Sequence, residues 1–267
     1  MNDLNGTSIW ITGASSGIGK GLALALSQRG ARLVLSGRNR AALDDVAAHC
    51  PGSLVEAFEV TDLDALPAIV ARVEQATGGI DWLVNNAGIS QRSLGLDTDF
   101  GVYRTLMEVD FFAPLRLTQL VLPAMVRRGS GRIINNASVA GKVGSPLRTG
   151  YCAAKHALVG WSDALRAEIA QYGVQVHVLT PGFVATGIGA NALTADGSRK
   201  GAGDDPVDGG ISIHEAAEQI IAGITADRPE IPVGREGAAE MQLLGLKRQD
   251  PDACFQLMAS MAPKLAR

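Results

Sequence analysis

Residues 8–19 have the sequence Ser8-Ile9-Trp10-Ile11-Thr12-Gly13-Ala14-Ser15-Ser16-Gly17-Ile18-Gly19, and they set the architecture of the chain. A short apolar run leads into a glycine-rich turn, and residues 20–26 have the composition of a helix, so the segment predicts strand, turn and helix. Glycines permit positive φ and let a pyrophosphate approach bare N–H groups, while the helix N-terminus adds partial positive charge. Taken alone, the T-G-x-x-x-G-x-G spacing is also compatible with a glycine-rich surface turn.

Tyr151 and Lys155 form a second pattern, because four-residue spacing in a helix places a phenol and an ammonium on one face. A free phenol is a poor base at neutral pH, but a neighbouring cation favours the phenolate and so permits proton transfer. An isolated pair of this kind also occurs by chance on helix surfaces. Cys152 lies beside Tyr151 and is expected to be a small buried residue.

The chain resembles the short-chain dehydrogenase/reductase family over about residues 5–190, because five motifs occur in the family's order. The motifs are residues 12–19, Asn85-Asn86-Ala87-Gly88, Ser138 thirteen residues before Tyr151, the Tyr151 and Lys155 pair, and Pro181-Gly182 followed by Thr186. Residues 139–186 are most similar to the branch with hydroxysteroid dehydrogenase 1-type and retinol-reductase-like members.

Apolar runs rich in Val, Ile and Leu alternate with helical segments along the rest of the chain. Strands are expected at 32–36, 53–58, 81–85, 132–137, 174–180 and 230–233, and helices at 40–49, 63–77, 102–128, 149–172 and 213–226. Continuous apolar strands indicate a parallel sheet with helices on both faces. The sequence predicts an α/β protein, a single doubly wound Rossmann domain over residues 1–267.

The resemblance implies hydride transfer between a nicotinamide and a carbinol or carbonyl carbon, with proton transfer at the oxygen. Tyr151 would be the acid/base group, and Lys155 would stabilise its phenolate and hold the nicotinamide ribose. Ser138 would hydrogen-bond the substrate oxygen, although a Ser that ends a strand can also simply cap a loop. This chemistry makes an oxidoreductase the first hypothesis, ahead of an NADPH-sensing regulatory protein without turnover or a scaffolding subunit.

The same resemblance implies a set of residues around the cofactor, although Asn85-Asn86-Ala87-Gly88 could also be only a strand-ending turn. Glu59 and Val60 stand where relatives more often have Asp-Val near the adenine. The expected cofactor residues are Gly13, Ser15, Ser16, Gly17, Ile18, Gly19, Arg38, Glu59, Val60, Asn86, Ala87, Gly88, Tyr151, Lys155, Pro181, Gly182, Thr186 and Ile188.

The expected strand at 32–36 ends in Ser36-Gly37-Arg38-Asn39, with no acidic residue to accept hydrogen bonds from a ribose 2′-hydroxyl. Arg38 stands where NADP-preferring relatives keep a basic residue, and a guanidinium can pair bidentately with a 2′-phosphate. Ser15 could add a hydroxyl donor. The alternative is a solvated arginine at a helix start. The sequence predicts NADP(H) in preference to NAD(H).

Asp110 stands where the resembled family has Asn, in the long helix before Ser138. In relatives a helix kink at this Asn frees its main-chain carbonyl to hold a water that links the lysine to solvent. Pro114 lacks the N–H that the Asp110 carbonyl would need, so we hypothesise that a proton relay survives through this backbone oxygen. The Asp110 side chain would brace the kink or pair near Lys155. The alternative is a drifted, non-catalytic residue.

Two segments depart from the regular pattern. Residues 187–212 are rich in turn formers, and the resemblance implies a mobile lid over the substrate rather than a plain disordered excursion. Residues 235–267 carry apolar side chains that could cap the site, contact a second subunit or pack into the core. A small apolar ketone or alcohol is the expected substrate, in a pocket with walls from Leu94, Leu96, Val139, Val143, Leu147 and Phe183.

Composition sets limits on the other possibilities. A formal charge of -3 over 267 residues, without a basic cluster, argues against nucleic-acid binding. Three cysteines without a C-x-x-C pair suit a reducing compartment, and no metal site is expected. No apolar run is expected to reach the ~18 residues of a membrane span. Some relatives in the branch carry an N-terminal anchor, whereas this chain is expected to lack one and to be cytoplasmic, as a homodimer or homotetramer.

Overall fold

A computed structural model describes residues 4–263 and contains a seven-stranded parallel sheet with the order β3-β2-β1-β4-β5-β6-β7. The strands are β1 (Ser8–Thr12), β2 (Arg32–Gly37), β3 (Leu54–Ala57), β4 (Trp82–Asn85), β5 (Gly131–Asn136), β6 (Val174–Pro181) and β7 (Glu230–Val233). The chain builds outward from β1 to β3 and then returns to β4 on the other side of β1. This reversal of strand order is the place where open α/β sheets bind ligands, at the carboxyl ends of the strands.

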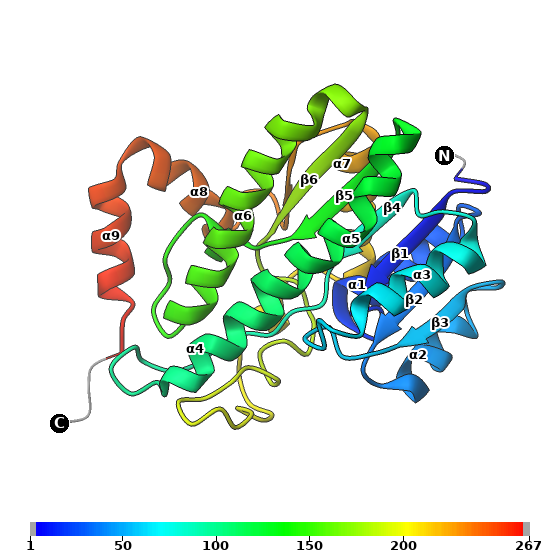
Figure 1. Cartoon of the computed structure of the whole chain (residues 1–267). Coiled ribbons are helices and arrows are strands. Elements are labelled where there is room, and N and C mark those ends of the chain that lie inside the picture. Colours follow the sequence, from blue (N-terminus) through cyan, green and yellow to red (C-terminus); the bar gives the residue numbers. More distant parts are fainter. Residues whose placement is uncertain (1–3, 264–267) are drawn as a thin grey trace.

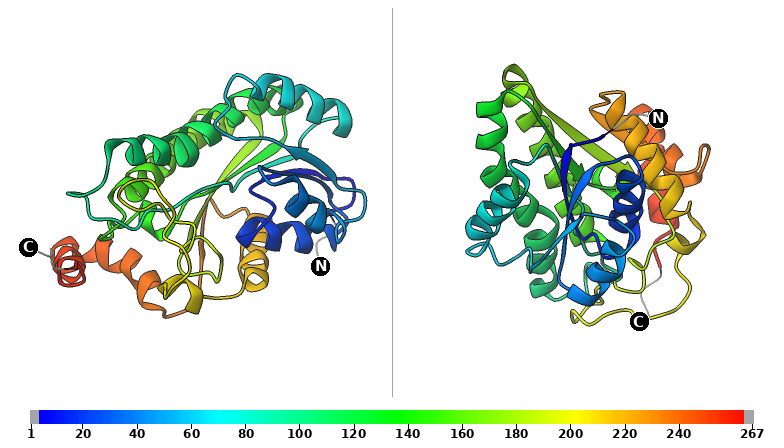
Figure 2. Two further views of the ribbon diagram at one scale, coloured as in Figure 1. Left: turned by 90° about the horizontal axis from the view of Figure 1, so that it is seen from below. Right: turned by 90° about the vertical axis from the view of Figure 1, so that its right-hand side faces the viewer.

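Helices cover both faces of the sheet, as the left-hand view of Figure 2 shows. One layer contains α1 (Gly17–Ser27), α2 (Arg40–Ala47) and α7 (Ile213–Thr225), and the other contains α3 (Leu66–Thr77), α5 (Ala113–Arg128) and α6 (Thr149–Ile169). Side chains of β1 alternate between the layers: Ile9 and Ile11 pack in the first, and Trp10 in the second. The predicted doubly wound Rossmann architecture is confirmed.

The long helix expected at 102–128 is interrupted, because α4 (Phe100–Met107) and α5 are joined by a π-helical turn, Glu108–Phe112. The Ala113 N–H donates to the Glu108 carbonyl, five residues back. Pro114 explains the interruption, since proline has no N–H to offer to the carbonyl of Asp110 and its ring displaces that carbonyl. The π turn therefore lies on the residue that departs from the family pattern.

The expectation that no apolar stretch reaches membrane-spanning length is wrong for this same helix. Phe100–Arg128 is 29 residues long and contains an 18-residue window with a mean hydropathy of 1.3, enough to cross a membrane by length and composition. Leu117, Val121 and Met125 of α5 are nevertheless buried against the sheet. Their burial identifies a core helix of an α/β domain, which can be as apolar as a membrane span.

After β7 the chain forms α8 (Ala239–Gln249) and α9 (Pro251–Ser260), which lie beyond the end of the sheet beside α6 (Figure 1). Cys254 and Met258 of α9 are buried against Val139 and Val143, next to a 3₁₀ turn at Val139–Gly141. The tail thus shares a small apolar core with the segment that follows β5. The last four residues of the expected tail, and the first three of the chain, lie outside the described residues.

Candidate active site

A cavity of about 1030 Å³ opens at the carboxyl ends of the strands around the β1–β4 reversal. Its lining includes all of the expected cofactor residues except Gly19, together with Ser138. Gly19 and Asp110 lie behind this surface and support it. The structure therefore brings residues from the whole span 13–188 to one place.

The glycine loop is shaped by close contact with the turn that follows β4. Gly13 and Gly17 have φ of +65° and +53°, which favour glycine. A Cβ at Gly13 would lie 2.8 Å from the Ala87 Cα, and one at Gly19 would overlap the Gly13 carbonyl and the Asn86 amide. These glycines are required because two backbones approach each other without room for side chains.

Thr12 and Asn86 join the loop to this turn. The Thr12 hydroxyl accepts hydrogen bonds from the Asn86 and Ala87 N–H groups, both at 3.0 Å. The Asn86 Nδ2 donates to the Thr12 and Gly13 carbonyls at 2.9 and 3.2 Å, and its Oδ1 accepts from Asn136 Nδ2 at 2.9 Å. The Asn86 side chain therefore links neighbouring strands. Because both ends of its amide are hydrogen-bonded within the protein, a ligand would contact the backbone of the turn instead.

Arg38 and Glu59 lie at the adenosine end expected for the cofactor, after β2 and β3. The Arg38 Nη1 is 3.6 Å from Glu59 Oε2, and both side chains are exposed. The guanidinium is held by a weak surface pair and can turn toward a different anion at low cost. Glu59 thus contacts Arg38, whereas the sequence alone indicated only a place near the adenine.

Tyr151 and Lys155 lie in the first turns of α6 and are both almost fully buried. The Lys155 Nζ is 5.7 Å from the centroid of the Tyr151 ring and donates to the Asn136 carbonyl at 2.9 Å. Ser138 accepts from the Ala140 N–H at 3.1 Å, and its hydroxyl donates to the Pro181 carbonyl at 3.4 Å. Ser138 therefore caps the 3₁₀ turn and also lines the cavity, so the two interpretations of this residue are compatible.

Asp110 is fully buried behind Lys155. Its Oδ1 is 3.5 Å from the Lys155 Nζ and accepts from the Ile89 N–H at 3.0 Å, while Oδ2 has no hydrogen-bond partner within residues 4–263. Burial raises the pKa of Asp110, against the opposing effects of the Lys155 charge and the Ile89 N–H. A Cβ at Gly88 would lie 2.7 Å from Oδ1, so the turn needs glycine here. The Asp110 side chain was expected either to brace the helix kink or to pair near Lys155, and the structure shows the pair with Lys155.

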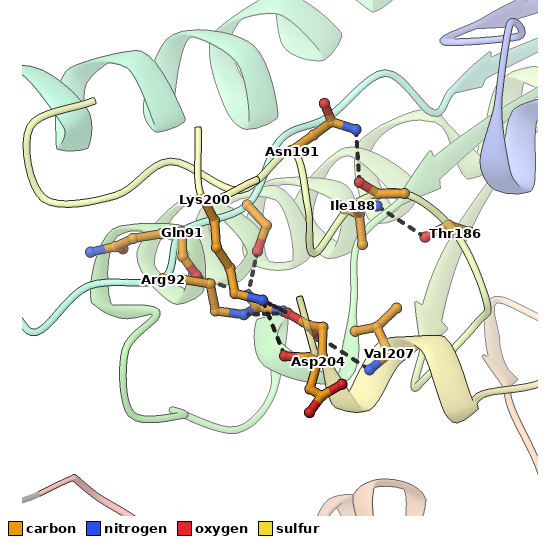
Figure 3. Close-up of polar contacts among 11 residues, drawn as sticks. Gln91, Arg92, Thr186, Ile188, Asn191, Lys200, Asp204 and Val207 are labelled. Atoms are coloured by element: carbon orange, nitrogen blue, oxygen red, sulfur yellow. Dashed lines mark hydrogen bonds and ion pairs between the residues drawn. The ribbon is translucent and has the colours of Figure 1, made fainter. Parts of the chain in front are cut away.

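Residues 187–212 fold over the cavity and are held by contacts that the sequence did not indicate. The Arg92 Nε and Nη2 each donate to Asp205 at 3.0 Å, with both side chains buried, and the Lys200 Nζ lies 3.6 Å from the same carboxylate. Figure 3 shows the ends of the Arg92 and Lys200 side chains close together, beside Asp204. Burial alone would raise the pKa of Asp205, but the Arg92 hydrogen bonds, the Val207 N–H and the two cations together lower it. The segment is thus anchored to the loop after β4.

Other residues of the site were missed at the level of the sequence. Asn136 supports both Asn86 and Lys155, and a signal was available, because Asn135-Asn136 ends β5 as Asn85-Asn86 ends β4. Asn85 and Asn135 also meet in the sheet, Nδ2 to Oδ1 at 2.8 Å. Arg92 and Arg148 likewise line the cavity, and nothing in the local sequence marks either one.

Comparison with known proteins adds independent information. Residues 7–196 match the family model described as short chain dehydrogenase. The chain is 37% identical over 266 residues to "Dehydrogenase/reductase SDR family member 7B" of Bos taurus, which covers 95% of this chain and 81% of the bovine protein.

Solved structures are similar over nearly their whole length. A short-chain dehydrogenase from Streptomyces avermitilis has a TM-score of 0.80 and 27% identity, over 96% of this chain and 97% of that one. A short chain dehydrogenase from Burkholderia cenocepacia J2315, solved in complex with NADP, has a TM-score of 0.80 and 25% identity, over 96% and 99% of the two chains.

Proposed function

The chain belongs to the short-chain dehydrogenase family and is an oxidoreductase, and from this premise we propose that it uses NADP(H) to interconvert a secondary alcohol and a carbonyl compound. The observation that carries the proposal is the joint placement of Ser138, Tyr151 and Lys155 on one cavity. Leu243, Leu257 and Met258 of the tail line that cavity and favour a substrate with an apolar body.

The residues around the glycine loop fit a dinucleotide. Gly13 and Gly17 have no Cβ of their own to hold a ligand away from the backbone, and the first turn of α1 has no acidic residue. Within the described part of the chain, Ser16 makes no side-chain hydrogen bond that caps α1, so the amides there remain available to a pyrophosphate. NADP(H), when bound, supplies or accepts the hydride.

The protein's own groups manage the proton and the developing charge. In reduction, the Tyr151 hydroxyl gives its proton to the substrate oxygen, while the Ser138 hydroxyl turns from the Pro181 carbonyl to donate to that same oxygen. Lys155 stays fixed by the Asn136 carbonyl and places its charge beside the tyrosinate that results. Oxidation of the alcohol runs through the same groups in reverse.

Replacement of Tyr151 tests this assignment directly. Tyr151→Phe should lower kcat by ~10²-fold or more with nearly normal cofactor affinity, because only the proton-transfer group is removed. Lys155→Met should weaken both turnover and cofactor binding. Tyr172→Phe, at an exposed tyrosine away from the cavity, is the matched control. A Tyr151→Phe enzyme that retains more than about a tenth of the native rate would contradict the proposal.

Preference for NADP(H) is the second part of the proposal and rests on Arg38. A 2′-phosphate would replace Glu59 as the partner of this guanidinium with stronger, bidentate geometry. Arg38→Asp should reverse the ratio of kcat/KM values for NADPH and NADH, and Glu59→Gln should raise that ratio slightly. An unchanged ratio in Arg38→Asp would exclude this role.

We also propose that the protein is a cytoplasmic homodimer or homotetramer. Phe255 of the tail is an exposed apolar side chain outside the cavity that a second subunit could cover. Light scattering on the purified protein gives the mass of the assembly, and a monomeric mass at micromolar concentration would contradict it. Fractionation of the source cells tests the location.

A further inference from the structure

Arg148 is a charged residue of the cavity that has no role in the proposed reaction. It lines the cavity as the N-cap residue of α6, three positions before Tyr151. Its side chain makes no hydrogen bond or ion pair to any residue that the structure describes. Four further arginines line the cavity: Arg38, Arg92 and Arg199 have Glu59, Asp205 and Asn191 as partners, and Arg104 is exposed to solvent, which balances its charge.

The surroundings of Arg148 make an unpaired cation costly. Burial lowers the pKa of this guanidinium, and the charge of Arg92 lowers it further. Tyr151, Asp205 and Cys152 oppose this lowering of the pKa, and Asp205 is the carboxylate among them. Its oxygens already accept from Arg92 and from the Val207 N–H, with Lys200 close by. One carboxylate therefore serves a group of three cations, and the charge of Arg148 remains unbalanced until an anion enters the cavity.

The backbone holds Arg148 in this position with some strain. Leu147 has φ of +65°, a conformation that branched side chains seldom adopt, and its carbonyl accepts from the Ser93 N–H at 3.1 Å. The first N–H groups of α6, at Gly150 and Tyr151, donate to Gln91 Oε1. Because Gln91 accepts from these two amides, they cannot bind a ligand. The Arg148 guanidinium has no such partner and is free to bind one.

We propose that the substrate is an oxo acid, or the corresponding hydroxy acid, and that Arg148 binds its carboxylate while the carbonyl lies at Tyr151. This inference rests on the proposed function. One guanidinium offers one charge and a planar fork of donors, which matches a carboxylate in both charge and shape. Leu243, Leu257 and Met258 would then contact the apolar chain of the acid. Arg148 is in this view a specificity-determining residue.

The test uses straight-chain oxo-octanoates with the ketone at different positions, each beside its methyl ester, with NADPH as reductant. For at least one isomer, native kcat/KM should be ~10-fold or more higher for the acid than for the ester, as expected for a charge-assisted pair. Arg148→Gln should remove this difference by raising the KM of the acid, with a much smaller change for the ester, and Arg148→Lys should restore part of it. Arg127→Gln, at an exposed arginine outside the cavity, is the matched control.

Two results would overturn the inference. The first is a native enzyme that reduces the esters as well as the acids. The second is an Arg148→Gln enzyme that loses activity equally on both, which would indicate a role in the structure of α6 or at Tyr151. Calorimetric titration of octanoate and methyl octanoate separates this inference from the proposed function. If no ketone is reduced, octanoate binding that Arg148→Gln abolishes still supports the anion site, and absent binding rejects it.

Discussion

On the cofactor wall of the cavity, formed by residues 12–19 and 85–88, Thr12 and Asn86 join two backbones by buried hydrogen bonds. On the substrate wall, formed by residues 187–212 and the tail helices, long side chains make the contacts, as where Asp205 pairs with Arg92 of the loop after β4. The first wall suits a ligand of fixed shape, since glycines and main-chain amides recognise a pyrophosphate. The second wall presents side-chain charge and apolar surface, which can select one substrate among many.

The substrate wall should be the more sensitive to loss of a single charge. Asp205→Asn leaves the buried Arg92 without its counter-ion, which we expect to lower the free energy of unfolding by about 3 kcal/mol and to raise the substrate KM. Cofactor affinity should be unchanged. Urea unfolding and steady-state kinetics measure these effects, with Asp204→Asn, the exposed neighbour, as control. If Asp205→Asn weakened cofactor binding as much as substrate binding, the two walls would not act separately.

This effect should also depend on pH with a defined sign. The pKa of Asp205 is lowered in the folded protein, so its contribution to stability is present above its unfolded pKa and is lost as the pH falls through the folded value. The stability difference between native protein and Asp205→Asn should therefore be full at neutral pH and shrink below about pH 4. If the stability difference stayed constant down to acid pH, the charge of Asp205 could not be its cause.

The cofactor wall should be sensitive to volume instead. Gly19→Ala places a methyl group against the Gly13 carbonyl and the Asn86 amide, and overpacking of this kind costs about 1–3 kcal/mol. We expect weaker NADPH binding, by fluorescence titration, with little change in substrate KM at saturating cofactor. Gly160→Ala in α6 is the matched control, because its methyl group meets open space and should stabilise the helix slightly. Normal NADPH binding by Gly19→Ala would contradict the packing argument.

Asp110 lies where the two walls meet, and its replacement should have the smallest effect. Asp110→Asn should keep near-native activity if the relay runs through the backbone carbonyl, whereas Pro114→Ala should slow turnover by restoring a regular helix there. Rates at several pH values decide between the side chain and the backbone. A fast Pro114→Ala enzyme in which the Asp110 carbonyl is hydrogen-bonded within the helix would exclude the backbone relay.

The same variant has a stability signature. The pKa of Asp110 is raised by burial, so its protonated form is favoured in the folded state and ionisation lowers stability as the pH rises through the folded value. The stability of Asp110→Asn relative to the native protein should therefore increase as the pH rises above about 4. Chemical unfolding across this range measures it, and the opposite slope would mean that the Lys155 charge outweighs burial.

The sequence predicted the parts of the molecule that depend on local pattern. The glycine loop, the parallel strands, and the Tyr151 and Lys155 pair each follow from spacing and composition, and Asp110 was marked by its departure from the family. Arg92 and Asp205 could not be paired in advance, because 113 residues separate them and only tertiary packing brings them together. Arg148 was missed for a related reason, since its importance lies in the absence of a partner among the residues around it.

The hydrogen bonds of the Thr12 hydroxyl also bear on the order in which the domain folds. This hydroxyl accepts from amides 74 and 75 positions further along the chain, so the glycine loop reaches its final form only after β4 has docked beside β1. Contacts of such long range form late and make α/β domains fold slowly. The amides of Asn86 and Ala87 should accordingly exchange hydrogen with solvent only when the whole domain opens. A cofactor that binds only the folded protein would make that opening rarer, and so would slow the exchange of these two amides.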